Sequence, residues 1–229
     1  MKPKKTFYAE AAYAAGIAVL ALGTALMERA NFGMSMVVAP AYLIHLKLSR
    51  ALPFFTFGMA EYALQAALLI ALALVMGKFK RGYLFSFVTA VIYGFALDGA
   101  IALVGCLPGG GMVHRAACYA VGLVACSVGV SLLFHTYLPP ETYELFVSEL
   151  SDRLGTDVSR TKTVYDLCSC AVSVALSFAF FGFGRFEGVK LGTVFCALVN
   201  GWLIGRINRL LERRFEFRDA LPWREAFTR

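Results

Sequence analysis

The stretch Gly23-Thr24-Ala25-Leu26-Met27-Glu28-Arg29 (GTALMER) ends a long apolar segment and has a counterpart later in the chain. The counterpart, from position 129 to position 135, is GVSLLFH, displaced by 106 residues. Other pairs keep nearly the same displacement: Gly82 and Gly188 at 106, Glu61 and Asp166 at 105, and Tyr93-Gly94 and Asn200-Gly201 at 107. The sequence therefore predicts two related halves, residues 7–105 and 113–210.

Both halves consist mainly of apolar runs. Of the 229 residues, 59% are hydrophobic and 16% are charged, a composition outside the range of soluble domains. A helix needs roughly 20 apolar residues to cross a bilayer, and in lipid its backbone groups must be bonded internally. Five runs are close to this length or longer: residues 11–27, 52–76, 83–113, 116–138 and 164–183. A sixth, 191–205, is short, but Lys190 and Arg206 at its ends can snorkel to the interfaces, so that residues 188–207 serve as the span. We therefore predict an all-α integral membrane protein, a single membrane domain (1–229) with six transmembrane helices.

The basic residues are distributed unevenly along the chain. If the N-terminus is cytoplasmic, six spans place residues 1–6, 77–82, 135–163 and 205–229 inside, and these segments hold 16 of the 22 Lys and Arg residues. Such an excess orients membrane proteins with the basic segments in the cytoplasm. We predict a multi-pass protein of the bacterial plasma (inner) membrane with both termini cytoplasmic. Residues 211–229 form a predicted basic tail that attracts anionic lipid headgroups, so the net charge of +7 does not indicate nucleic acid.

A repeat with three spans reverses its own direction across the membrane. The two halves are therefore predicted to be inverted repeats related by a pseudo-twofold axis in the membrane plane. Many secondary transporters have this plan and bind substrate near the midplane where the repeats meet. Channels and some scaffolds share the plan, so it favours transport without deciding it.

Each half also carries a long connection after its first span. Residues 36–48 are apolar but too short to cross the membrane, and Ser35 is their predicted N-cap. Residues 140–154 place Tyr143, Phe146, Leu150 and Leu154 on one helical stripe, with acids on the face expected to meet water. Two interpretations stay open: a pair of interfacial helices, or a pair of re-entrant helices whose ends point at a central cavity.

Ionisable side chains within spans identify a candidate substrate site. Each costs about 2.5–3.5 kcal/mol on insertion scales and is therefore a functional candidate. Glu61 lies about 13 Å along its helix at 1.5 Å per residue, near the bilayer midplane, and Gln65 follows one turn later. The repeat adds two residues of the second half. Asp166 is at the position equivalent to Glu61 and is called its mate, and Asn200 is the mate of Tyr93. We predict that Glu61, Gln65, Asp166 and Asn200 bind the substrate.

Other charged residues fall near the ends of spans. Glu28, Arg29 and Asp98 are predicted to form an ion-paired outer rim, and His135 occupies the position equivalent to Arg29. These four are the predicted gating or rim residues. The Cys and His residues have no metal-ligand spacing, and no hydrolytic arrangement is visible, so the sequence predicts no metal, no cofactor and no enzyme activity.

Two segments carry a family resemblance. Residues 29–35, RANFGMS, resemble the R-A-x-x-G-x-S junction of the bacterial YczE/YitT-like membrane proteins, and residues 187–209 resemble their glycine-led last span through Gly188, Gly192, Thr193 and Gly201. The chain departs from that pattern at Met36, where many members have proline, and at His135. The resemblance implies a small polytopic plasma-membrane protein, mostly without an assigned substrate.

The sequence thus favours a small secondary transporter that moves a small solute, cationic or proton-coupled, by alternating access. The alternative is a membrane scaffold or regulatory protein that holds a partner through residues 140–154 and the basic tail. Both hypotheses require the lipid bilayer, and a homo-oligomer is compatible with either.

Overall fold

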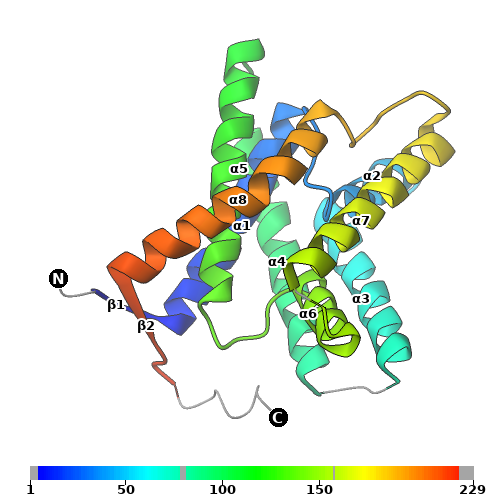
Figure 1. Cartoon of the computed structure of the whole chain (residues 1–229). Helices are drawn as coiled ribbons and strands as arrows, with labels where there is room; N and C mark the ends of the chain where they lie inside the picture. Colours follow the sequence, from blue (N-terminus) through cyan, green and yellow to red (C-terminus); the bar gives the residue numbers. More distant parts are fainter. Residues whose placement is uncertain (1–4, 78–80, 157, 222–229) are drawn as a thin grey trace.

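The computed structural model describes residues 5–77, 81–156 and 158–221. In this part of the chain the elements, in order, are β1 (Lys5–Tyr8), α1 (Ala9–Ala30), α2 (Ala39–Leu48), α3 (Phe57–Met76), α4 (Arg81–Gly105), α5 (Met112–Phe134), α6 (Thr142–Leu154), α7 (Val158–Phe181), α8 (Leu191–Arg214) and β2 (Phe215–Arg218). Figure 1 shows their arrangement. Each half therefore contains a long helix, a short helix and two more long helices.

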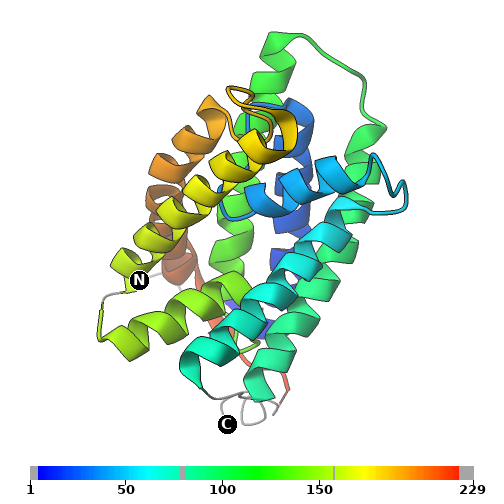
Figure 2. The same ribbon diagram turned by 90° about the vertical axis from the view of Figure 1, so that its right-hand side faces the viewer.

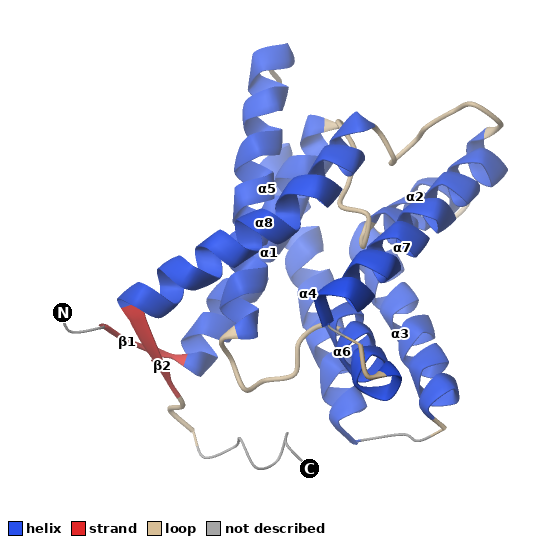
Figure 3. Cartoon of the chain, in the orientation of Figure 1, coloured by secondary structure: helices blue, strands red, loops and turns tan. Residues whose placement is uncertain are grey.

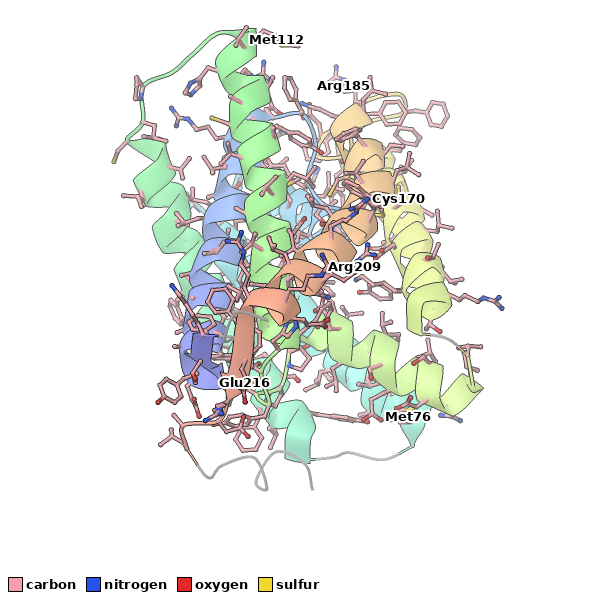
Figure 4. All side chains as sticks on the ribbon, turned by 60° about the vertical axis from the view of Figure 1, so that its left-hand side comes forward. Met76, Met112, Cys170, Arg185, Arg209 and Glu216 are labelled. Atoms are coloured by element: carbon pink, nitrogen blue, oxygen red, sulfur yellow. The ribbon has the colours of Figure 1, made fainter. Side chains whose placement is uncertain are left out.

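Six of these helices are long and apolar enough to cross a membrane: α1, α3, α4, α5, α7 and α8. This confirms the predicted all-helical membrane protein with six candidate spans. In Figure 4, Met76 at the end of α3 and Glu216 after α8 lie at one end of the molecule, whereas Met112 and Arg185 lie at the other. Successive long helices therefore run in alternating directions.

The centre of the fold is the close crossing of α1 and α5. A methyl group added at Gly23 would lie 2.8 Å from the carbonyl oxygen of Gly122, and one added at Gly129 would lie 2.8 Å from that of Gly16. Larger residues at these positions would push the helices apart. Small residues let helix backbones approach closely in membranes, where water provides no driving force for association.

The two short helices pack in a similar way, because α2 and α6 each contact both α3 and α7. Figure 2 shows both crossing these longer helices. The prediction that Ser35 caps α2 is wrong: the N-cap is Val38 without a side-chain bond, and Ser35 contributes its carbonyl to the amides of Val38 and Ala39. The apolar stripe predicted for α6 is right at Tyr143 and wrong at Leu154, which is exposed. Its buried face is formed by Thr142, Tyr143, Val147 and Ser151.

The last two helices of each half differ in their packing. Helices α3 and α4 pack along each other, and a methyl group at Gly94 would lie 2.9 Å from the carbonyl oxygen of Gly58. Helices α7 and α8 share no comparable contact and lie apart in Figure 1. Gly201 on α8, the sequence mate of Gly94, has open space where a side chain would be.

The two ends of the described chain pair with each other. Strands β1 and β2 form a parallel two-stranded sheet (Figure 3), with Phe7 packed 5.6 and 5.8 Å from the rings of Phe215 and Phe217. The amides of Ala220 and Leu221 donate to the Glu10 carboxylate. The predicted tail, 211–229, is therefore folded against the N-terminus up to residue 221, and residues 222–229 lie outside the described part.

Candidate functional site

A buried polar cluster lies where the N-terminal end of α6 meets α3. Glu61 and Gln65 on α3 are both fully buried. The Tyr143 hydroxyl donates to Glu61 Oε1 at 2.9 Å, and the Thr142 amide donates to Gln65 Oε1 at 3.0 Å. Gln65 Nε2 lies 3.5 Å from Glu61 Oε1 and 3.4 Å from Glu141 Oε2. A glutamine side chain thus caps α6 and links two buried acids.

Three side-chain oxygens in this cluster have no hydrogen-bond partner among the described residues. They are Glu61 Oε2, Glu141 Oε1 and Thr142 Oγ1, all buried. Leaving such a group unpaired costs about 1–3 kcal/mol or more for a charge. Burial raises the pKa of Glu141 well above its ordinary value, and the nearby Glu144 and Glu61 carboxylates raise it further. Burial also raises the pKa of Glu144, which the Lys162 ammonium opposes.

A cavity lies between the N-terminal ends of α2 and α6. Its volume is about 60 Å³. Its walls come from α1, α4, α5 and α8, and many of the wall residues are apolar. Its polar edge is formed by Glu141, Glu144, Lys162 and Asn200, and its lining includes Leu20, Thr24, Ser35, Tyr93, Cys126, Val130, Leu133 and Ile204. An apolar cavity with a few polar groups is the usual form of a small-molecule site.

A second cavity continues from the first into the space between α7 and α8. The two share Ser35, Val37, Lys162 and Asn200, and the second also has Asp166 and Gly201 in its wall. Lys162 Nζ lies 3.9 Å from Glu144 Oε1 and 4.0 Å from Asp166 Oδ1. The lysine therefore stands between two carboxylates where the cavities join.

The structure places the four predicted substrate-binding residues around these cavities at different depths. Asn200 faces both cavities and accepts a hydrogen bond from Ser127 Oγ at 2.9 Å. Asp166 faces the second cavity. Glu61 and Gln65 are not in either wall and instead lie behind Tyr143 and Glu141, which are in the wall of the first cavity.

The predicted outer ion pair is wrong for the described residues, in which neither Glu28 nor Asp98 pairs with Arg29. The Arg29 guanidinium donates to the carbonyls of Val104 (2.8 Å), Gly105 and Leu107 at the end of α4. Asp98 instead accepts from the Thr56 hydroxyl at 2.6 Å and the Gly58 amide at 2.8 Å, at the start of α3. Helix ends leave backbone groups unsatisfied, and these charged side chains satisfy them.

Glu28 and His135 also make local contacts. Glu28 lies beside Tyr42 and His45 of α2. His135 Nδ1 lies 2.7 Å from the Ser131 carbonyl, and its Nε2 lies 3.6 Å from Glu212 Oε1 on α8. Arg29 and His135 thus each connect the first long helix of a half to the end of its last helix.

Glu141, Glu144 and Lys162 were not among the predicted site residues. The acids of α6 were assigned to water because they lie off the predicted apolar stripe, and Lys162 was counted only as a topology signal. The pair Pro139-Pro140 directly before Glu141 could have indicated that an acid stands at a helix start. Within the described residues, no three His, Cys, Asp or Glu side chains are grouped as metal ligands.

A family model matches residues 7–209, which include all six candidate spans up to the last turn or so of α8 and both short helices. The model is described as a family of unknown function, DUF6198. The chain belongs to this family. Neither a curated protein nor a solved structure matches it.

Proposed function

We propose that this member of DUF6198 is a small secondary transporter that moves a small cation by alternating access. The proposal rests mainly on one observation: the cavity lies between the starts of two short helices, and a buried Glu141 oxygen without a partner is in its wall. This oxygen of the Glu141 carboxyl group has no hydrogen-bond donor among the described residues, and a cationic solute or a proton would provide one.

The inverted-repeat interpretation is supported by the positions that meet at the centre. Gly16 contacts Gly129, and Gly23 contacts Gly122. The displacement of 106 makes Gly122 the mate of Gly16 and Gly129 the mate of Gly23, so each glycine meets the mate of the other. Reciprocal contacts of this kind are what a twofold axis produces.

The cavity wall follows the same relation. Leu20 and Cys126 are mates at a displacement of 106, as are Thr24 and Val130, and all four are in the wall. Segments 35–38 and 140–144, which begin the two short helices, face the cavity together. This arrangement favours the re-entrant interpretation over the interfacial one, because broken helices that end at a central site are typical of transporters.

The unequal packing of the two halves supports two alternating states. Helices α3 and α4 are closed at Gly58 and Gly94, whereas the mate of Gly94, Gly201, faces open space in the second cavity. In the opposite state α7 would pack on α8 at Gly201, and α3 would separate from α4. The cavity would then close on the α7–α8 side and open on the α3–α4 side.

We further propose that the protein lies in the bacterial plasma membrane with both termini in the cytoplasm. The likeness to YczE/YitT-like proteins favours the bacterial plasma membrane, and the excess of basic residues favours cytoplasmic termini with the basic tail near anionic headgroups. A homo-oligomer is compatible with the transport cycle and is not required by it.

The test measures transient currents on supported proteoliposome membranes as small inorganic and organic cations are added. We expect a saturable current with at least one cation, which Glu141→Gln abolishes. Gly201→Leu should fold normally, because its side chain enters open space, but should block closure and reduce the current at least about tenfold. Gly205→Leu is the matched control, because Gly205 also has open space on α8 and lies outside the cavity walls.

Absence of current with every cation, or an unchanged current in Gly201→Leu, would overturn the proposal. A membrane scaffold, the alternative function, would tolerate Glu141→Gln and Glu61→Gln and would lose partner binding when residues 212–229 are removed.

A further inference from the structure

Lys162 is already present where a cationic substrate would bind. On the basis of the proposed function, we infer that the substrate is a primary ammonium compound with a small apolar body, and that Lys162 fills its ammonium subsite while the cavity is empty. The side chain acts as a tethered competitor that the substrate displaces.

Lys162 lies between two carboxylates at the junction of the two cavities. It is in the wall of both cavities, and its Nζ lies 3.9 Å from Glu144 Oε1 and 4.0 Å from Asp166 Oδ1. These distances are longer than those of a hydrogen-bonded ion pair, about 2.7–2.9 Å. The lysine is therefore loosely held between two acids and can leave one of them.

Asp166 gives the displaced lysine a place to go. It lies one turn after Lys162 on α7, an (i, i+4) pair, so that Lys162 can pair with Asp166 when it leaves Glu144. A substrate ammonium would then pair with Glu144 and approach the unpartnered oxygen of Glu141. Each positive charge keeps a carboxylate throughout the exchange, which avoids a buried unpaired charge.

The remaining wall of the first cavity determines the rest of the substrate. Away from the acids it is formed mostly by aliphatic side chains, among them Leu20, Val130, Leu133 and Ile204. A strongly hydrated polyamine or metal ion would make no apolar contact with these aliphatic side chains. A compact alkyl or aryl group would bury it, at about 25 cal/mol for each Å² removed from water.

The test measures binding of phenethylamine to the purified full chain in detergent by calorimetry, with 3-phenylpropionate as the carboxylate counterpart. We expect saturable binding of the amine and none of the acid. Lys162→Met removes the competitor, so the dissociation constant for the amine should fall at least about threefold, which corresponds to a subsite that the lysine occupies about two-thirds of the time. Lys162→Arg keeps a cation there and should not tighten binding.

Arg160→Met is the control, because Arg160 is an exposed cation on the same helix and is not in either cavity wall. The role of Lys162 would be overturned if folded Lys162→Met bound the amine no more tightly than the wild type. The same conclusion would follow if Arg160→Met lowered the dissociation constant as much as Lys162→Met does. Failure of the wild-type chain to bind the amine would overturn the substrate class, while transport of other cations could still be observed. Amine binding without any transport current would instead contradict the proposed function alone.

Discussion

Replacement of Gly23 by alanine tests the crossing of α1 and α5 on which the two-half architecture depends. The added methyl would lie 2.7 Å from the Cys126 amide nitrogen and 2.8 Å from the Gly122 carbonyl oxygen, both backbone atoms that cannot rotate away. Ordinary contacts begin at 3.4 Å, so the helices must separate by about 0.7 Å. Such overpacking costs about 1–3 kcal/mol.

That cost should be measurable as a lower melting temperature. For a chain of this size, 1 kcal/mol corresponds to about 2–4 °C, so Gly23→Ala should melt about 2–12 °C below the wild type. The measurement is thermal unfolding in detergent followed with a thiol-reactive dye, since Cys126, buried at this crossing, becomes reactive when the helices separate.

Gly99→Ala provides the control. Gly99 lies on α4 and nothing stands within 4 Å of an added methyl, so the substitution should be neutral or slightly stabilising through helix propensity. The double variant Gly23→Ala with Gly122→Ala should lose less than the sum of the two single losses, because both open the same crossing. Equal melting of Gly23→Ala and Gly99→Ala would refute the close crossing.

Three further outcomes follow from the buried acids and the helix ends. Burial and neighbouring carboxylates raise the pKa of Glu141 in the folded state, so the folded state prefers the protonated acid. The free energy of unfolding should therefore be highest below the ordinary pKa of about 4.3, and it should decrease as the pH rises through the raised pKa. Melting temperature measured against pH should be flatter for Glu141→Gln, and an equally steep profile would contradict this. The Thr56 hydroxyl caps α3 by accepting from the Met59 amide, and it donates to Asp98, so Thr56→Ala should lower the free energy of unfolding by about 1–2 kcal/mol. Thr56→Ser keeps the hydroxyl and should retain most of the stability. Equal losses for the two variants in chemical unfolding would argue against the cap. Asp98→Asn should cost less than Asp98→Ala, because the amide oxygen can still accept from Gly58, and the same unfolding measurement compares them.

The sequence predicted the six spans because hydrocarbon thickness fixes the length and apolarity of a transmembrane helix. It also located Glu61 and Gln65 on one helical face, and the structure joins them, because residues one turn apart are neighbours on any helix. These predictions depend on local geometry alone.

The features that the sequence did not predict depend on contacts between segments that are distant in the sequence. The acids of α6 were expected in water, but α6 packs against α3, α4 and α7, which buries Glu141. Arg29 and Asp98 were expected to pair because their charges are opposite and their depths similar, yet each is closer to a helix end that needs it. The pairing of β1 with β2 joins segments about 210 residues apart and has no local signal in either.

The most direct test of alternating access is side-specific labelling of residue 200. Asn200→Cys is prepared in a background without the native cysteines and is treated with a membrane-impermeant maleimide from one side of the membrane or from the other. If access alternates, the thiol reacts from both sides, and Gly201→Leu restricts the reaction to one side. A thiol that reacts from the same single side in both proteins, or from neither side, would contradict alternating access.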